Sequence, residues 1–340
     1  MIISRTPYRI SFFGGGTDYP LWYLENGGKV LGTAIDKYCY ITCRILPPFF
    51  EHKHRIAYSK IETVFSIDEI QHPSVRETIR YFKETLGYLK EDIGLEIHHD
   101  GDIPARSGMG SSSAFTVGLL KTLYALSGKV ISKEILYKEA IHIEQNLIKE
   151  NVGSQDQVWV TCGGLNLIEF LQNGKIIVKP IIMKENQLRK FEKKFMLFFT
   201  GISRCASEIA GDKIQNLLKR KEELFRIMDL VDEAYKILTS EKDNFADFGK
   251  LLNETWLLKK KISTKITSNE IDNIYEAALK NGAVGGKLLG AGGGGFILFY
   301  VEPETQDRVK KALSDYLHVP FRFDFSGSEI IVYRPEYYTK

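Results

Sequence analysis

Residues 103–120, IPARSGMGSSSAFTVGLL, place two glycines and three consecutive serines directly before an apolar pattern of helical spacing that stops at Gly128. The first turn of a helix has unpaired backbone N–H groups and a partial positive charge, so an anion placed there is stabilised. Gly108 and Gly110 have no side chains to keep an anion away, and serine hydroxyls can bond phosphate or a hard cation. The stretch therefore predicts a phosphate-binding loop.

Three other interpretations of this loop follow from the residues alone. A serine could simply cap the helix, but one would suffice and the chain has three, at positions 111–113. A Walker loop is excluded because the nearest match, GGKLLG, follows Lys287 with leucine. Gly108, Gly110 and Ser113 match the spacing of a dinucleotide fingerprint, without a clean βαβ unit or ribose-binding acid around them. A dehydrogenase stays a distant alternative.

Composition narrows the class of protein. A chain of 340 residues exceeds the size of one ordinary hydrophobic core, which favours two domains. Its 46 basic and 43 acidic side chains leave a net charge of +3 without a basic block, so we expect no nucleic-acid partner. The absence of a long apolar run or signal peptide predicts a cytoplasmic protein with no membrane partner. The 4 cysteines and 7 histidines show no zinc-site spacing, which predicts buried reduced thiols and no structural metal.

The order of patterns along the chain predicts an α+β protein. The first 46 residues read as strand, glycine turn and strand, and helical patterns follow at 73–89, 113–128 and 132–150. Near residue 190 the chain becomes charged and then strongly apolar, and it ends in a strand–helix–strand pattern. We place a domain boundary there, which divides the chain into residues 1–190 and 191–340.

Two further glycine-rich stretches accompany the serine loop. TPYRISFFGGGTDYP at 6–20, IPARSGMGSSSA at 103–114 and GGKLLGAGGGGF at 285–296 resemble, in this order, the three signature motifs of the GHMP kinases. This superfamily includes galactokinase, homoserine kinase and mevalonate kinase. The resemblance implies a two-domain fold, with an N-terminal domain like ribosomal protein S5 domain 2 at 1–190 and a ferredoxin-like C-terminal domain at 191–340. ATP and substrate would bind between them, and the late glycines would let two backbones pack closely beneath the nucleotide loop.

The resemblance also assigns roles to residues around ATP. The loop that would hold the triphosphate consists of Arg106, Ser107, Gly108, Met109, Gly110, Ser111, Ser112 and Ser113. Ser112 and Glu144 would hold Mg²⁺; helical spacing alone does not choose Glu144, since Glu139 flanks the apolar stripe on its other side. Asp156 would take or orient the proton of the attacking hydroxyl, and Arg9 would steady it. Without the family, Asp156 would be expected in an Asx turn and Arg9 on a strand surface.

The implied substrate site is assembled from several loops. Its residues would be Gly15, Gly16, Thr17, Asp18, Gly163, Gly164 and Arg204. Galactokinases carry an acidic residue and a histidine where this chain has Gly15 and Gly16, which argues against galactose and for a larger or phosphorylated sugar. A sugar phosphate needs a cationic clamp, for which Arg204 is the candidate and Lys287 or Arg106 the alternatives.

Within the superfamily the motifs look most like those of sugar-1-kinases acting on D-glycero-D-manno-heptose 7-phosphate, with the kinase domain of L-fucokinase a relative. This implies ATP-dependent phosphorylation of the anomeric hydroxyl to the 1,7-bisphosphate, which supplies nucleotide-activated heptose for surface polysaccharide. A fucokinase-like enzyme acting on an unphosphorylated sugar and a non-catalytic sugar or nucleotide sensor stay as alternatives. The sequence leaves open whether the chain forms a homo-oligomer.

Overall fold

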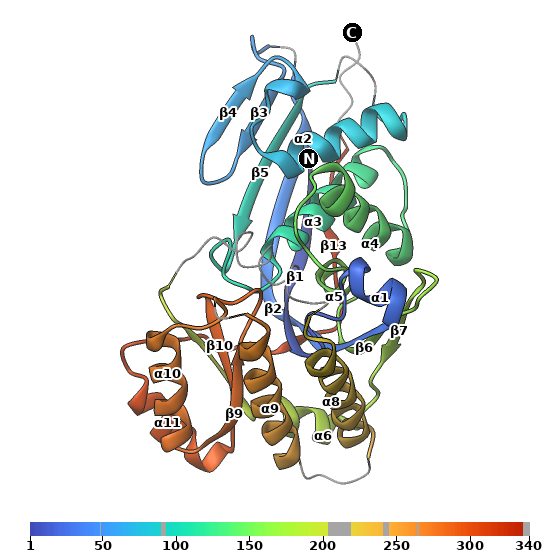
Figure 1. The fold of residues 1–340 in the computed structure, drawn as a ribbon. Helices are drawn as coiled ribbons and strands as arrows, with labels where there is room; N and C mark the ends of the chain where they lie inside the picture. Colours follow the sequence, from blue (N-terminus) through green and yellow to red (C-terminus); the bar gives the residue numbers. More distant parts are fainter. Residues whose placement is uncertain (48, 90–92, 203–218, 241–244, 264, 336–340) are drawn as a thin grey trace.

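The computed structural model describes residues 1–340 except 48, 90–92, 203–218, 241–244, 264 and 336–340. It contains two sheets, a large one formed mainly by the first half of the chain and a small one formed by the second half (Figure 1). No described helix is both long enough and apolar enough to cross a membrane. The predicted α+β class is confirmed.

The large sheet is built on two long antiparallel strands. β1 (Ile2–Phe13) pairs along most of its length with β2 (Gly28–Ile45), and the segment between them begins with the three glycines of the first motif. The central path of the sheet runs β13-β1-β2-β5-β3-β4, and β6 extends the far end of β2. The remaining strands of this half are β3 (His54–Ala57), β4 (Ile61–Val64), β5 (Leu95–Gly101), β6 (Leu165–Phe170) and β7 (Ile176–Pro180).

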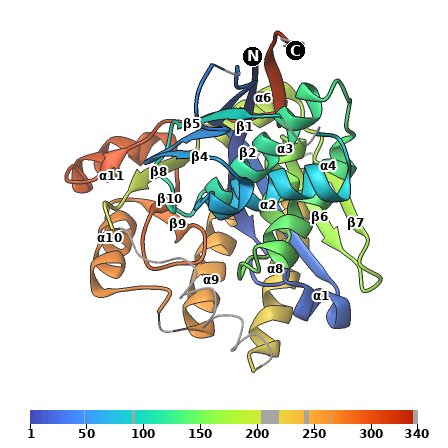
Figure 2. The same cartoon turned by 90° about the horizontal axis from the view of Figure 1, so that it is seen from above.

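Helix α3 (Ser111–Leu126) packs against β1 and β2 and begins where the serine loop ends. It is apolar on nearly all sides because neighbouring helices cover the faces that the sheet leaves, and Figure 2 shows α2, α3 and α4 gathered on one side of the strands. The helices of this half are α1 (Pro20–Asn26), α2 (Pro73–Arg80), α4 (Lys133–His142) and α5 (Gln155–Cys162). Short 3₁₀ or π turns occur at Ile67–Glu69, Tyr81–Thr85 and Ile143–Leu147.

The small sheet has the ferredoxin-like topology that was expected. Its strand order is β11-β8-β10-β9, so the first and third strands are central and the second and fourth lie at the edges. Its strands are β8 (Phe195–Phe199), β9 (Ala283–Leu288), β10 (Phe296–Val301) and β11 (Leu317–His318). Its helices are α6 (Glu185–Glu192), α8 (Lys221–Thr239), α9 (Ala246–Ile262), α10 (Asn269–Lys280) and α11 (Gln306–Ala312), with a 3₁₀ turn at Pro303–Thr305.

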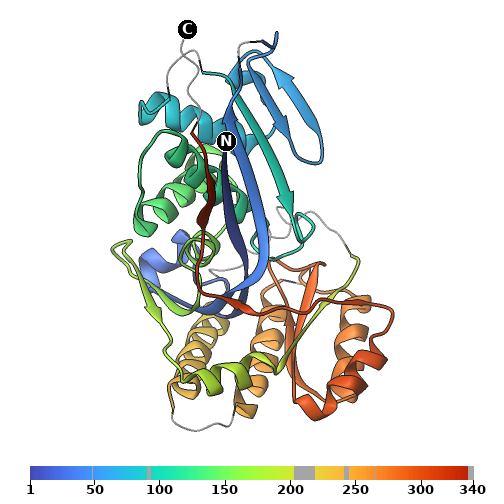
Figure 3. The ribbon, with the colours of Figure 1, turned by 180° about the vertical axis from the view of Figure 1, so that it is seen from behind.

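The end of the chain departs from the predicted division at residue 190. β12 (Phe323–Asp324) pairs with β2, and β13 (Glu329–Tyr333) pairs with β1, so both belong to the large sheet. Figure 3 shows β13, in red, beside the dark blue β1. The segment at 320–325 was expected to complete the C-terminal domain, and β13 was not predicted. Pairing with β13 covers the backbone N–H and C=O groups along part of β1, which would otherwise form an open sheet edge.

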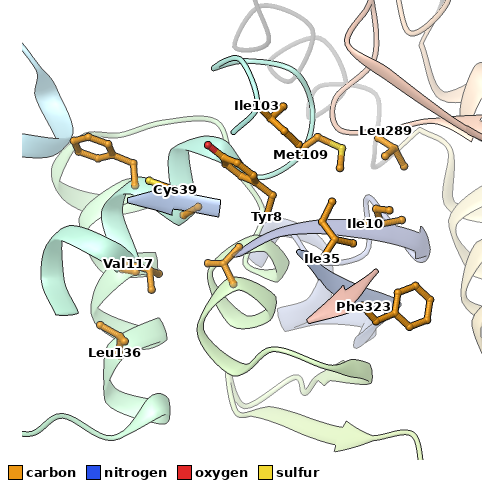
Figure 4. Packing of buried hydrophobic residues seen from close by; sticks show 14 of the residues in the cluster. Tyr8, Ile10, Ile35, Cys39, Ile103, Met109, Val117, Leu136, Leu289 and Phe323 are labelled. Atoms are coloured by element: carbon orange, nitrogen blue, oxygen red, sulfur yellow. The ribbon is translucent and has the colours of Figure 1, made fainter. Parts of the chain in front are cut away.

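An aromatic cluster joins the two halves. Phe12 of β1 stacks on Phe195 of β8 with ring centroids 5.0 Å apart and meets Phe248 of α9 edge-on at 5.5 Å. Earlier in β1, the buried side chains of Tyr8 and Ile10 lie toward Met109 and Leu289 (Figure 4). The end of β1, which belongs to the first motif, is therefore packed against β8 and α9 of the second half.

The cysteines agree with the expectation of reduced thiols where the structure describes them. Cys39 and Cys43 are buried and free, and Cys162 is free and partly exposed. Cys205 lies outside the described residues.

Candidate active site

A cavity of about 300 Å³ is lined by both halves of the molecule. The residues from the first half, here called the N-terminal wall, are Arg9, Ser11, Gly15, Asp18, Tyr19, Arg106, Gly108, Gly110, Ser111, Ser112, Ser113, Glu150, Asn151, Val152, Gly153, Gln155 and Asp156. The residues from the second half, here called the C-terminal wall, are Ile227, Thr255, Lys259, Lys287, Gly290 and Ala291. The three glycine motifs meet at this cavity.

The first turn of α3 opens onto the cavity without a side-chain cap. Gly110 occupies the capping position in the left-handed region (φ 76°, ψ 27°), and no side chain accepts a hydrogen bond from the helix end. The hydroxyl of Ser111 instead accepts a bond from the backbone N–H of Arg106 at 3.1 Å. The interpretation of the serines as helix caps is therefore wrong, and the helix N-terminus is left to bind an anion.

Glycines of the third motif support this loop by close backbone contact, as expected. A Cβ on Gly108 would lie 2.8 Å from the carbonyl oxygen of Leu289, and a Cβ on Gly290 would lie 2.4 Å from the Cα of Gly108. A Cβ on Gly295 would lie 2.2 Å from the carbonyl oxygen of Ser107. Any side chain at these glycines would push the loop away from the small sheet.

Arg9 and Asp156 form a bidentate ion pair at the cavity, as the resemblance implies. Arg9 Nε donates to Asp156 Oδ1 at 2.8 Å, Nη2 donates to Oδ2 at 2.5 Å, and Nη1 donates to the carbonyl of Gly108 at 2.6 Å. Arg9 is buried, whereas the side chain of Asp156 stays 24 % exposed. Asp156 lies in the first turn of α5, a helix that the sequence patterns did not predict. The guanidinium thus orients a carboxylate that remains accessible from the cavity.

The first motif contributes Asp18 and Gly15 to the cavity. Asp18 Oδ1 accepts from the backbone N–H of Gly16 at 2.9 Å, and Oδ2 accepts from Gln155 Nε2 at 2.8 Å. A Cβ on Gly153 would lie only 1.8 Å from Asp18 Oδ2, so this glycine makes room for the carboxylate. Asp18 is 1 % exposed and is held in one position by these contacts.

Several residues expected at the substrate or nucleotide site do not line the cavity. The hydroxyl of Thr17 donates to the carbonyls of Gly14 and Lys29, which ties the motif to β2. Gly163 and Gly164 end α5 and pack against the returning chain: a Cβ on Gly163 would lie 2.4 Å from the backbone nitrogen of Gly327. The side chain of Met109 lies in the hydrophobic core, and Gly16 and Ser107 are likewise absent from the lining. Arg204 lies outside the described residues.

The serines and the two nearby glutamates pair differently from the expectation. Ser113 Oγ donates to Glu144 Oε2 at 2.9 Å, and Gln157 Nε2 donates to the same oxygen at 2.5 Å. Ser112 is exposed, and its Oγ lies 3.5 Å from Glu150 Oε2. The structure therefore places Glu144 against Ser113, which is buried, and Glu150 against Ser112, which is exposed.

The donor set nevertheless fits a magnesium ion. Glu144 is fully buried, its Oε1 atom has no hydrogen-bond partner within the described ranges, and burial raises the pKa of its carboxyl to about 8. Burial also raises the pKa of Glu150. Among the described residues no three His, Cys, Asp or Glu side chains cluster into a metal site. Mg²⁺ prefers a few hard oxygen ligands from the protein, with phosphates and water completing its shell. The hydroxyl of Ser112 and the carboxyl of Glu144 are ligands of this kind.

The cavity also contains residues that the sequence did not identify. Thr255 and Lys259 stand one turn apart on α9, within the segment NETWLLKKKIS, which resembles any amphipathic helix. Glu150 and Gln155, which precede Asp156 in the sequence, also line the cavity, although neither was assigned a role. Thr255 and Lys259 could be identified only from the packing of α9 against the cavity, since their local pattern is that of an ordinary helix.

Comparison with known proteins shows the family to which the chain belongs. Residues 74–164 match the family model for the N-terminal domain of GHMP kinases, and residues 236–319 match that for the GHMP kinase C-terminal domain. The D-glycero-alpha-D-manno-heptose 7-phosphate kinase of Campylobacter jejuni is 31 % identical over 92 % of this chain and 93 % of its own length. The L-fucokinase/L-fucose-1-P guanylyltransferase of Bacteroides fragilis is 25 % identical over 93 % of this chain and 36 % of its own.

A solved structure agrees along the entire chain. The crystal structure described as a D-glycero-D-manno-heptose 1-phosphate kinase from Bacteroides thetaiotaomicron superposes with a TM-score of 0.80 and 25 % identity, covering 100 % of both chains. A second, described as a sugar kinase from Campylobacter jejuni, has a TM-score of 0.71 and 28 % identity over 97 % of both.

Proposed function

Because this chain belongs to the GHMP kinases and is an ATP-dependent sugar kinase, we propose that it phosphorylates the anomeric hydroxyl of D-glycero-α-D-manno-heptose 7-phosphate. The product would be the 1,7-bisphosphate, a precursor of nucleotide-activated heptose. The observation that carries the proposal is the Arg9–Asp156 pair, set directly beside an uncapped helix N-terminus in one cavity.

The N-terminal wall supplies the nucleotide site. The backbone N–H groups of the first turn of α3 and the loop glycines would bind the β- and γ-phosphates, with the loop held in place by the third motif. Ser112 and Glu144 would hold Mg²⁺, which supplies neutralising charge to the phosphates when bound, and Glu150 stands next to Ser112 as a further oxygen donor. The exposed position of Ser112 supports this assignment.

The same wall supplies the acceptor chemistry. Asp156 would take the proton of the attacking hydroxyl as its oxygen bonds to the γ-phosphorus and the bond from that phosphorus to the β-phosphate oxygen breaks. Arg9 orients this carboxylate through two hydrogen bonds. Its third bond, to the carbonyl of Gly108, fixes the carboxylate relative to the phosphate loop.

The sugar would occupy the space next to Asp18 and Gly15. Asp18 presents a fixed carboxylate to sugar hydroxyls, and the glycine leaves room that a side chain would fill. The similarity to a protein named for heptose 7-phosphate supports a phosphorylated seven-carbon sugar. The structural neighbour is named for a heptose 1-phosphate, so the position of the new phosphate has to be measured.

An assay that couples ADP release to a panel of sugars tests the proposal. The panel contains D-glycero-D-manno-heptose 7-phosphate, the free heptose, L-fucose and galactose, each with ATP and Mg²⁺, and ³¹P NMR of the product locates the new phosphate. Activity on the heptose 7-phosphate with a new signal coupled to the anomeric proton is expected. Activity on free L-fucose alone would replace the proposal with the fucokinase-like alternative, and binding without turnover would favour a sensor.

A further inference from the structure

The two walls of the cavity differ in charge. Among the described lining residues, the N-terminal wall contains the carboxylates Asp18, Glu150 and Asp156, whereas the C-terminal wall contains no carboxylate. The C-terminal wall contributes two ammonium groups, Lys259 and Lys287, to the cavity. A surface of this composition attracts anions.

Both lysines are buried and are held by backbone carbonyls. Lys259 Nζ donates to the carbonyls of Leu288 at 3.0 Å and Gly290 at 2.7 Å, and it is 5 % exposed. Lys287 Nζ donates to the carbonyl of Phe12 at 2.8 Å, and it is 3 % exposed. Both ammonium groups also line the cavity, so they give this wall a positive charge that would attract an anionic group of a ligand.

A third polar group lies on the same wall. Thr255 precedes Lys259 by one helical turn, so both side chains leave α9 on the same face. Thr255 is 2 % exposed, and its buried hydroxyl has no hydrogen-bond partner among the described residues. A buried hydroxyl without a partner loses stabilisation, which a ligand oxygen in the cavity would restore.

The proposed reaction involves two anionic groups, the triphosphate of ATP and the phosphate of the sugar. In the proposed function the triphosphate of ATP binds the first turn of α3 and its loop, which includes Arg106, on the opposite wall, so the phosphate of the sugar needs cationic partners of its own. We propose that Thr255, Lys259 and Lys287 form the clamp for the phosphate group that the sugar substrate already carries. This inference rests on the proposed function, in which the acceptor is a sugar phosphate, and it assigns the clamp to α9 and β9 instead of Arg204.

Two substitutions test the clamp, with a matched control on the same helix. Thr255→Val is expected to raise the KM for heptose 7-phosphate about fivefold to tenfold, and Lys259→Met about tenfold to a hundredfold. The KM for ATP should stay within about twofold, and Lys261→Met, at an exposed position of α9, should change neither. Because the Thr255 hydroxyl has no partner in the part of the chain that the structure describes, Thr255→Val should keep or raise the melting temperature while weakening the binding of the sugar phosphate. A merely structural residue would not show this pattern.

A second arm uses inorganic phosphate as an inhibitor against whichever sugar the wild type accepts. Competition with the sugar, weakened in both variants, is expected. The clamp is refuted if the variants raise the KM for ATP instead, or if phosphate does not compete with the sugar. A wild type that prefers a free sugar overturns the proposed function, and phosphate competition then still decides whether this wall binds an anion.

Discussion

The two walls of the cavity contain different chemistry and come from different kinds of sequence. The N-terminal wall has three carboxylates, two guanidinium groups and an open helix end, and most of the residues that form it lie in or beside glycine-rich motifs. The C-terminal wall has two ammonium groups and a hydroxyl, carried by α9 and β9. The difference suggests a division of labour, in which one wall performs phosphoryl transfer and the other recognises the acceptor.

The largest effect is expected from the chemistry of the N-terminal wall. Asp156→Asn keeps the size of the side chain and a hydrogen bond to Arg9 but removes the group that takes the proton. We expect kcat to fall about 10³-fold, with the affinity for a fluorescent ATP analogue changed less than about threefold. Turnover within tenfold of the wild type would remove Asp156 from the mechanism and with it the assigned role of this wall.

The next largest effect is expected at the contact between the two walls, where Gly290 packs against Gly108. Gly290→Ala adds a Cβ 2.4 Å from the Cα of Gly108 at φ +67°, and it should lower stability by about 2–3 kcal/mol and weaken ATP binding at least tenfold. Gly128→Ala is the matched control, because Gly128 has φ +66° but nothing within 4 Å of the added Cβ. Thermal melts and ATP titrations of both should differ; equal effects would mean that the loop does not depend on the third motif.

A smaller effect separates two neighbouring serines within the N-terminal wall. Ser112→Ala should raise the Mg²⁺ concentration for half-maximal activity about tenfold without changing stability, because this side chain is exposed at the cavity. Ser113→Ala should instead lower stability by about 1–2 kcal/mol, since it removes a hydrogen bond to buried Glu144. A Mg²⁺ titration and a melt of each variant check this, and the reverse pattern would exchange the roles of the two serines.

The smallest effect on activity is expected from a group remote from both walls. His72 accepts a hydrogen bond from Val75 at the start of α2 and stacks on Phe115, and burial lowers its pKa to about 4. A pKa below the unfolded value means that its contribution to stability is complete above pH 6.5 and is lost as the pH falls toward 4.

The substitution His72→Asn keeps a capping acceptor that does not titrate. Its melting temperature should therefore fall less than that of the wild type between pH 6.5 and 4.5, with both KM values unchanged at pH 7.5. A changed KM for either substrate would show that the walls are coupled to α2.

The sequence predicted the N-terminal wall better than the C-terminal one for a physical reason. Glycines that let two backbones approach leave a local pattern, and the resemblance carried by those patterns placed Arg9 beside Asp156 across 147 positions of the chain. It did not place Glu144 against Ser113, because which serine faces inward depends on where α3 begins.

Residues whose role depends only on distant packing were not predictable. Thr255 and Lys259 look like ordinary helix positions until α9 is set against the cavity. β13 was missed since a short strand forms only where β1 offers an open edge, and α5 because its first turn follows a glycine and reads as a loop. The division at residue 190 does not describe the end of the chain, because β12 and β13 pair with strands of the first half.

The most direct test of the account is the ratio of kcat/KM for D-glycero-D-manno-heptose 7-phosphate to that for the unphosphorylated heptose, measured with the wild-type protein, ATP and Mg²⁺. A clamp of two lysines and a threonine that recognises the sugar phosphate predicts a ratio of about 10² or more. A ratio near one, or a preference for the free sugar, would contradict it.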